Sequence, residues 1–146
     1  MIALGSDHNG VALKKAVIEF LENKGYGCTD VGAYEEASHD DYPVYARKVA
    51  DLVASGEAEK GFLFCGTGIG MMLCANKKPG VRAVCSIDSY SVKYSRYHND
   101  ANVLCMGANV ISAGLAKELA EIFLTSDFMG ERHERRVRMI EDIYKK

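Results

Sequence analysis

The chain has 146 residues, 48% of them apolar, and its 18 basic and 20 acidic residues give a formal net charge of −2. This length predicts a single domain over residues 1–146 with a core of its own. Because both signs of charge are mixed along the chain, we expect no surface for nucleic acid or an anionic membrane, and any bound anion should be small. No apolar run approaches the roughly 20 residues that span a bilayer, and the N-terminal residues lack a signal-peptide pattern, so we expect a cytoplasmic protein.

The cysteines predict neither disulfides nor a structural zinc site. Their number is odd, they contain no C-x-x-C pair, and most of them lie inside apolar runs: Cys28, Cys65, Cys74, Cys85 and Cys105. A small, reduced core side chain explains most of them. Cys65 differs because it closes an apolar run at a glycine-rich turn, which leaves both a functional and a structural interpretation open.

The apolar runs predict strands that alternate with helices. In chain order, strands are expected near residues 1–8, 27–31, 61–65, 81–86 and 102–107. Helices are expected over residues 11–21, 43–53, 71–77, 88–97, 113–124 and 131–144. This alternation predicts an α/β fold, with a parallel sheet that is covered on both faces and connected by right-handed crossovers.

The stretch Gly61–Gly70 organises the rest of the sequence. An apolar run ends in Cys65, three glycines follow at every second position, and a helix-compatible run begins. Glycines at such a junction leave successive backbone N–H groups free to converge on an anion, and the helix adds the positive end of its dipole. The same environment favours a thiolate, so we expect a proton acceptor beside a cradle for negative charge, with an opening next to the sulfur.

Other polar residues follow the predicted strands and should lie near Cys65, because ligands bind outside the carboxyl ends of the strands in an open α/β sheet. Asp7 and His8 follow the first strand, Asp88 the fourth and Asn109 the fifth. Asp7 and His8 also suit the cap of the first helix. Tyr42, at the start of the second helix, either reaches this edge or packs over the helix end.

His98 follows a helix and precedes a strand, which places it at the opposite edge of the sheet within one chain. If it acts with Cys65, a second subunit must supply it; the alternative is a histidine whose cationic form is favoured by the helix C-terminus. Arg132 and Arg136 lie one helical turn apart on one face, where two guanidinium groups suit a phosphate. Interspersed glutamates make a salt-bridged surface an equally good explanation.

Two other functions are compatible with the glycine turn. It lacks the G-x-G-x-x-G spacing of dinucleotide-binding proteins and follows the third strand, although Asp88 lies about 20 residues downstream, where a ribose-binding acid is expected. A nucleotide-binding module is therefore the second hypothesis. The third is a non-catalytic domain that responds to CoA or phosphate, which would need neither Cys65 nor His98.

Five segments together resemble the type B ribose-5-phosphate isomerases and the related galactose- and allose-6-phosphate isomerases. They are Gly5–Gly10, Asp41–Pro43, Cys65–Gly70, Ser95–Asp100 and Gly130–Val137. The resemblance covers nearly the whole chain in order. It implies a three-layer α/β/α Rossmann-like sandwich with a five-stranded parallel sheet and a C-terminal helix. It also implies a homodimer or dimer of dimers with shared active sites.

The implied reaction interconverts ribose 5-phosphate and ribulose 5-phosphate in the pentose phosphate pathway, without metal or cofactor; a six-carbon sugar phosphate is the alternative substrate. By the same resemblance, Cys65 is similar to the base, His98 to the residue that opens the sugar ring, and Asp7 and Thr67 to groups that assist at sugar oxygens. The backbone from Gly66 to Gly70, including Gly68 and Ile69, resembles the enediolate cradle. The implied phosphate ligands are His8, Arg132 and Arg136, Tyr42 and Asn99 are implied substrate contacts, and His133 has no assigned role.

The chain departs from the family pattern at one position. Many relatives carry an arginine that helps to bind the phosphate where this chain has Asn109. The substitution bears on phosphate affinity or on the preferred length of the sugar. The thiol base also marks a branch of the family, because other members use a carboxylate inside the turn, and Ile69 supplies none here.

Overall fold

The structure is a computed structural model that describes residues 1–37 and 39–145, and it is built on a five-stranded parallel sheet with the order β2-β1-β3-β5-β4. The strands are β1 (Ile2–Ser6), β2 (Cys28–Asp30), β3 (Lys60–Cys65), β4 (Ala83–Cys85) and β5 (Val103–Gly107). The helices are α1 (Val11–Asn23), α2 (Tyr42–Ser55), α3 (Ile69–Ala75), α4 (Ser89–Tyr97), α5 (Ala113–Thr125) and α6 (Arg132–Asp142), with a 3₁₀ turn, η1 (His8–Gly10), before α1. This architecture confirms the predicted α/β fold.

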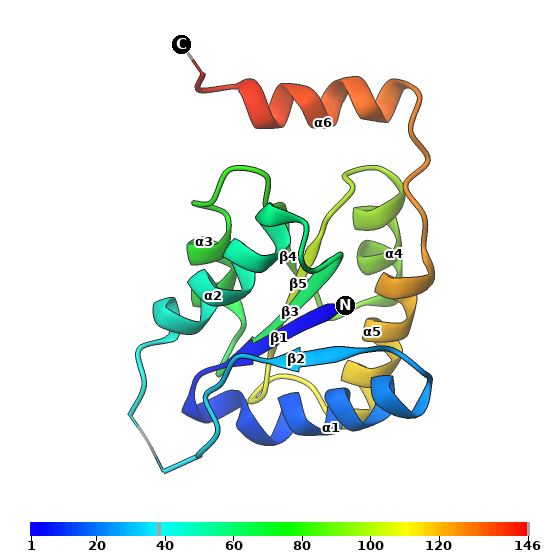
Figure 1. Cartoon of the computed structure of the whole chain (residues 1–146). Coiled ribbons are helices and arrows are strands. Elements are labelled where there is room, and N and C mark those ends of the chain that lie inside the picture. Colours follow the sequence, from blue (N-terminus) through cyan, green and yellow to red (C-terminus); the bar gives the residue numbers. More distant parts are fainter. Residues whose placement is uncertain (38, 146) are drawn as a thin grey trace.

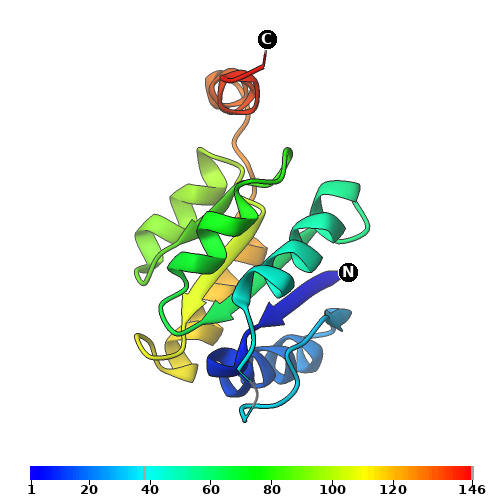
Figure 2. The ribbon, with the colours of Figure 1, turned by 90° about the vertical axis from the view of Figure 1, so that its left-hand side faces the viewer.

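Helices cover both faces of the sheet (Figure 1, Figure 2). On one face, α1, α4 and α5 close a core in which the rings of Phe62 and Phe123 meet edge to face at 5.6 Å. On the other face, α2 and α3 cover a second core that contains Leu63 and Cys65. Successive side chains of a strand point to opposite faces, so the alternating run in β3 contributes to both cores.

The C-terminal helix α6 lies across the edge of the sheet at which the strands begin. In Figure 2 the strand arrows point away from α6. The carboxyl ends of the strands, where an α/β sheet binds its ligands, are therefore at the opposite edge from this helix.

Strand β4 is shorter than predicted, and a 3₁₀ turn that the sequence did not predict precedes α1. A strand was expected over residues 81–86, but β4 covers only Ala83–Cys85. Its outer edge pairs with a side chain instead of a strand, because the Asn76 amide accepts from the N–H of Ala83 at 2.8 Å and donates to its carbonyl at 2.9 Å. The turn η1 precedes α1 because the Asp7 carboxylate accepts from the N–H of Asn9 at 2.9 Å and caps this turn.

Lys14 is a charged side chain with no exposed surface. Its Nζ lies 2.7 Å from Oδ1 of Asp30 and also donates to the carbonyl of Ala33. Burial lowers the pKa of Lys14, while the hydrogen bond and the charge of Asp30 oppose that change. The pair ties α1 to the segment that leaves β2, which leads on to α2.

The structure also bears on disulfides, membrane-spanning helices and metal clusters. All five cysteines are free thiols. Within residues 1–37 and 39–145, no helix is long and apolar enough to cross a membrane. The same residues contain no group of three or more histidine, cysteine and acidic side chains placed to hold a metal ion.

Candidate active site

The carboxyl ends of β1 and β3 lie side by side at the centre of the sheet. The chain runs from β1 to its neighbour β2 on one side, whereas β3 pairs with β5 on the other, so this is the switch point of the sheet. The N–H of Asp7 donates to the carbonyl of Phe64 at 3.1 Å. A Cβ on Gly10 would lie 2.6 Å from the same oxygen, so only glycine allows the turn after β1 to pack this closely on β3. Asp7 and Cys65 therefore leave the sheet beside each other.

Cys65, the last residue of β3, is 5% exposed, and it lines an open pocket. Its Sγ accepts a hydrogen bond from the N–H of Gly68 at 3.1 Å, which stabilises negative charge on the sulfur. Gly68 has a φ of 81° and turns the chain into α3. The opening that the sequence interpretation required beside Cys65 is present. The pocket lining consists of Asp7, Asn9, Tyr42, Cys65, Gly66, Thr67, Ile69, Gly70 and Leu73.

The turn after Cys65 presents backbone donors to this pocket. Within the described part of the chain, the N–H groups of Gly66, Thr67 and Gly70 have no hydrogen-bond partner. The N–H of Ile69 donates to the hydroxyl of Thr67 at 3.3 Å. Free backbone N–H groups held in a fixed turn can stabilise an oxyanion without reorganising during the reaction.

The end of strand β5 contacts this turn and fixes its backbone. The carbonyl of Cys65 accepts from the N–H of Ala108 at 2.8 Å, and that of Gly66 accepts from the N–H of Asn109 at 3.0 Å. A Cβ on Gly107 would lie 2.7 Å from the backbone of Thr67, so the turn rests directly on the end of β5. The position of the N–H donors therefore depends on a strand that comes much later in the sequence.

Three other predicted residues lie at the same edge. Asp7 is 4% exposed, and it both caps η1 and lines the pocket, so the two interpretations of this residue are compatible. The ring of Tyr42 packs against Gly70, where a Cβ would lie 2.7 Å from the ring. His8 lies next to the pocket lining, and its Nδ1 accepts from the N–H of Asp40 at 3.2 Å.

His98 belongs to a separate cluster next to α6. Its ring stacks on His133 with centroids 4.1 Å apart and planes at 10°. His133 is 5% exposed, and its Nε2 has no hydrogen-bond partner among the described residues. Burial lowers the pKa of His133, and the charges of His98, Arg132 and Arg136 lower it further. These four side chains therefore form one cluster, whose fixed positive charge comes from the two arginines.

The two arginines of this cluster are available for a ligand. Arg132 and Arg136 are exposed, and neither forms an ion pair with a described residue. The nearby Arg138 behaves differently, because it pairs with Glu134 at 2.7 Å. A salt-bridged surface thus describes Arg138, while the other two guanidinium groups are free to take up a phosphate.

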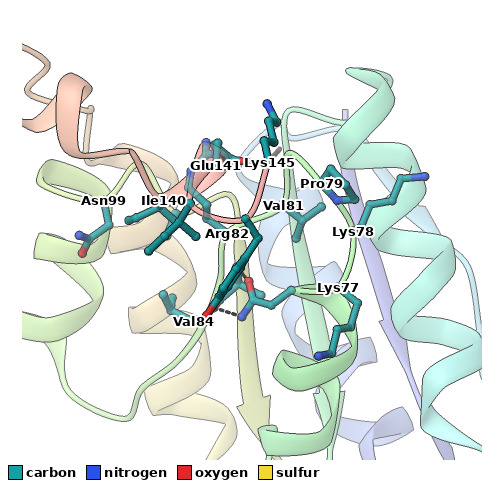
Figure 3. A pocket seen from close by; sticks show the side chains of 15 residues that line it. Lys77, Lys78, Pro79, Val81, Arg82, Val84, Asn99, Ile140, Glu141 and Lys145 are labelled. Carbon is teal, nitrogen blue, oxygen red and sulfur yellow. Dashed lines mark hydrogen bonds and ion pairs between the residues drawn. The ribbon is translucent and has the colours of Figure 1, made fainter. Parts of the chain in front are cut away.

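The far half of α6 is fixed to the body by ion pairs. Glu141 lies 2.6 Å from Arg82, which also reaches Asp100 at 3.3 Å. Arg82 and Glu141 line a hollow together with Ile140 and Asn99 (Figure 3). Since Asp100 comes two residues after His98, this network holds α6 and the end of α4 together.

The predicted site residues therefore fall into two groups. The carboxyl edge brings together Asp7, His8, Tyr42 and Cys65–Gly70, and the α6 side brings together His98, Asn99, Arg132 and Arg136. The stacking of His133 on His98 was not predicted from the sequence, although the spacing of Arg132, His133 and Arg136 in one motif was a signal. The contact between Cys85 and the turn was not predicted either, and the sequence carried no signal for it.

Asp88 has a structural explanation. Its carboxylate caps α4 by accepting from the N–H of Ser91 at 2.7 Å, and this hydrogen bond lowers the pKa of Asp88. The acidic residue that a nucleotide-binding module would need downstream of the turn thus serves as a helix cap.

Comparisons with known proteins show which family the chain belongs to. The model of a family described as Ribose/Galactose Isomerase matches residues 2–140. The chain belongs to the ribose/galactose isomerase family. One member, ribose-5-phosphate isomerase B of Escherichia coli, is 42% identical over 139 residues, which cover 95% of this chain and 93% of that protein.

Solved structures of family members have the same fold. Ribose-5-phosphate isomerase B of Clostridium thermocellum superposes with a TM-score of 0.95 at 43% identity, covering 99% of this chain and 97% of that one. The enzyme of Mycoplasma genitalium, solved with bound ribulose-5-phosphate, gives a TM-score of 0.94 at 36% identity, with 99% and 96% covered. These matches confirm the family inferred from the five sequence segments.

Proposed function

We propose that this chain is a single isomerase domain that interconverts ribose 5-phosphate and ribulose 5-phosphate. The observation that carries the proposal is the Cys65 sulfur, which lies in an open pocket next to backbone N–H groups that have no partner among the described residues. Family membership supports the reaction, since a relative in Escherichia coli is named ribose-5-phosphate isomerase B and another was solved with bound ribulose-5-phosphate.

In this proposal Cys65 acts as the base. Its thiolate removes a proton from C2, the electron pair that remains forms an enediolate with C1, and the thiol returns the proton to C1. In the same conversion the hydroxyl proton on O2 passes to O1, so that the carbonyl moves from C1 to C2. The N–H groups of Gly66, Thr67 and Gly70 hold the oxygen charge, and the loss of one such donor typically costs about 10²- to 10³-fold in rate. Asp7 and the hydroxyl of Thr67 contact sugar oxygens.

A second copy of the chain completes each site. His98, Arg132 and Arg136 lie on the α6 side of the molecule, away from the Cys65 pocket, so one chain supplies only half of the groups that the reaction needs. Apolar side chains lie uncovered at both halves: Leu73 in the pocket lining is 60% exposed and Ile143 at the end of α6 is 70% exposed. Contact between two chains would remove this apolar surface from water.

We assign the remaining roles within this homodimer or dimer of dimers. His98 of one chain opens the sugar ring, Arg132 and Arg136 bind the phosphate together with His8 of the other chain, and Tyr42 and Asn99 contact the sugar. Binding the phosphate far from the reacting carbons orients C1 and C2 against the thiolate.

The same proposal places the enzyme in the cytoplasm and in the pentose phosphate pathway. Five unpaired thiols fit a reducing compartment. Allose and galactose 6-phosphates are the competing substrates. Asn109, next to Gly66, brings no charge to the phosphate, so we expect phosphate binding to depend on the two arginines.

A coupled isomerisation assay with ribose, allose and galactose phosphates tests the function. We expect turnover of ribose 5-phosphate by the unchanged protein and nearly complete loss in Cys65→Ala, with sugar-phosphate binding retained. Cys74→Ala is the matched control, because it removes another thiol nine positions later on α3, outside the pocket. Full activity of Cys65→Ala would rule out the thiol as base.

Mixing two inactive variants tests the shared site. Cys65→Ala and His98→Asn chains, allowed to exchange subunits, should form hybrid dimers with one intact site and regain part of the activity. Subunit exchange without any regained activity would contradict the two-chain site. The aldehyde form of the substrate should partly rescue His98→Asn if His98 opens the ring.

A further inference from the structure

We propose that Cys85 is a positioning residue that holds the peptide bond donating to Cys65 and thereby favours the Cys65 thiolate. The inference rests on the proposed role of Cys65 as base. Cys85 ends β4, which is separated from β3 by β5 in the sheet. The turn after β3 crosses the end of β5 and reaches the Cys85 side chain.

The two thiols contact opposite ends of a single peptide group. The N–H of the peptide between Thr67 and Gly68 donates to Cys65 Sγ at 3.1 Å. Its carbonyl, on Thr67, accepts from Cys85 Sγ at 3.6 Å. A donor at the carbonyl polarises the peptide and strengthens donation by its N–H. The Cys85 thiol therefore reinforces the hydrogen bond that stabilises negative charge on Cys65.

Packing gives Cys85 a second way to hold this peptide. A Cβ on Gly68 would lie 2.9 Å from Cys85 Sγ, so the sulfur fills the space directly beside Gly68. Gly68 has a positive φ of 81°, and because it has no side chain its backbone is freer to rotate than that of other residues. The neighbouring sulfur opposes a rotation that would turn the Thr67 carbonyl towards Cys65.

The surroundings of Cys85 favour the protonated form of its thiol, which is the form that donates. Burial raises the pKa of the Cys85 thiol, and the charge of Cys65 raises it further. Among the described residues, the other titratable groups around Cys65 are Asp7 and Tyr42 in the pocket lining and the buried thiol of Cys105. None of these groups is changed by substitution of Cys85, so a shift in the Cys65 titration can be assigned to the peptide contact.

Alkylation of Cys65 by iodoacetamide, followed by peptide mass spectrometry across pH, tests the inference. Cys85→Ala and Cys85→Val remove the donor, and we expect alkylation of Cys65 at neutral pH to slow about three- to tenfold, with its midpoint moved to higher pH. Cys85→Ser keeps a donor and should stay closer to the unchanged protein. Cys28→Ala is the matched control, because this half-buried thiol lies 3.9 Å from the carbonyl of Tyr26 on the edge strand β2.

Steady-state kinetics give a second readout. In Cys85→Ala and Cys85→Val, the acid limb of the pH profile of kcat/KM should move to higher pH. KM should stay within about twofold, because the peptide contact acts on the base and not on phosphate binding. An unchanged Cys65 midpoint in both variants overturns the inference, and so does a shift of equal size in Cys85→Ser or Cys28→Ala. If Cys85→Val unfolds, the comparison of Cys85→Ala with Cys85→Ser decides.

The alkylation experiment also separates this inference from the proposed function. It needs no substrate, so it reports on the Cys65 thiolate whether or not the chain turns over ribose 5-phosphate. Absence of turnover in the unchanged protein contradicts the isomerase function. Normal turnover with no effect of Cys85 contradicts only the positioning role.

Discussion

The substitution Gly107→Ala tests whether the position of the N–H donors controls catalysis. Gly107 ends β5 and is in ordinary extended conformation, so an alanine there introduces no backbone strain of its own. Its Cβ, however, would lie 2.7 Å from the carbonyl carbon, Cα and oxygen of Thr67. The added methyl group must therefore push the turn away from the strand.

The size of the effect follows from this contact. Ordinary van der Waals contact begins at 3.4 Å, so the Thr67 backbone must move by about 0.7 Å. Overpacking of this kind costs about 1–3 kcal/mol in the free energy of unfolding. A displacement near 1 Å in groups that orient the reaction costs about 10²-fold, so we expect kcat/KM to fall about 30- to 100-fold.

The assay compares kcat, KM and urea unfolding for Gly107→Ala with those for Gly27→Ala. Gly27 is the matched control, because a Cβ at that position meets nothing within 4 Å and its φ is not positive. Most of the loss should be in kcat, since in the proposed mechanism the N–H donors of the turn contact the enediolate and not the bound phosphate. An unchanged kcat in a Gly107→Ala protein that has lost stability would refute the reasoning, because it would show that the turn can move without affecting the reaction.

Three further predictions concern other parts of the structure. Lys14→Met should lower the free energy of unfolding by about 3 kcal/mol, because the Asp30 carboxylate loses its ion pair and keeps only the hydrogen bond from the N–H of Gly32. Lys15→Met on the exposed face of α1 should change it by less than about 0.5 kcal/mol in urea unfolding. Because the pKa of His133 is lowered in the folded chain, the unfolded chain binds a proton at a higher pH than the folded chain does. The free energy of unfolding should therefore decline as the pH falls through the ordinary value of 6.5, and His133→Gln should reduce the dependence of the urea midpoint on pH. Arg136→Gln should raise KM for ribose 5-phosphate at least about tenfold, while Arg138→Gln, which removes an arginine already paired with a glutamate, should leave KM within about twofold in the coupled assay.

The carboxyl-edge half of the site could be predicted because its signals are local. Cys65 follows its apolar run directly, and the glycines that shape the turn come next in the chain. Asp7 likewise follows a short apolar run at the start of the sequence. The rule that parallel strands end at one edge then brings these residues together without knowledge of the strand order.

The supports of the turn could not be predicted in the same way. Gly107 and Cys85 contact the turn because β5 and β4 lie next to β3 in that order. Strand order is decided by long-range packing of the helices on the two faces, and a periodic pattern of apolar residues does not encode it. The bounds of β4 were also missed, because the amide of Asn76 replaces a neighbouring strand there.

The stacking of His133 on His98 depends on contacts between residues that are even further apart in the sequence. The sequence predicted a helix over residues 131–144, but periodicity alone does not say what that helix lies against. Its position is set by contacts with residues far away in the chain, such as the pair between Glu141 and Arg82. The prediction that His98 lies away from Cys65 needed only the chain order of helix and strand, and it is confirmed.

The separation of the Cys65 pocket from the arginines on α6 has an electrostatic explanation. A pentose phosphate carries its charge at one end and reacts at the other, so the enzyme must hold two negative centres apart: the phosphate and the enediolate. Neutral backbone donors beside Cys65 suit the second, and the positively charged cluster on α6 suits the first. In a twofold-symmetric pair each contact occurs twice, so a single interface that sets one chain's arginines against its partner's thiol creates both active sites at once. In the proposed dimer, the distance between the two groups within one chain is therefore what the shared site requires, and the interface would cover the exposed apolar residues at both halves.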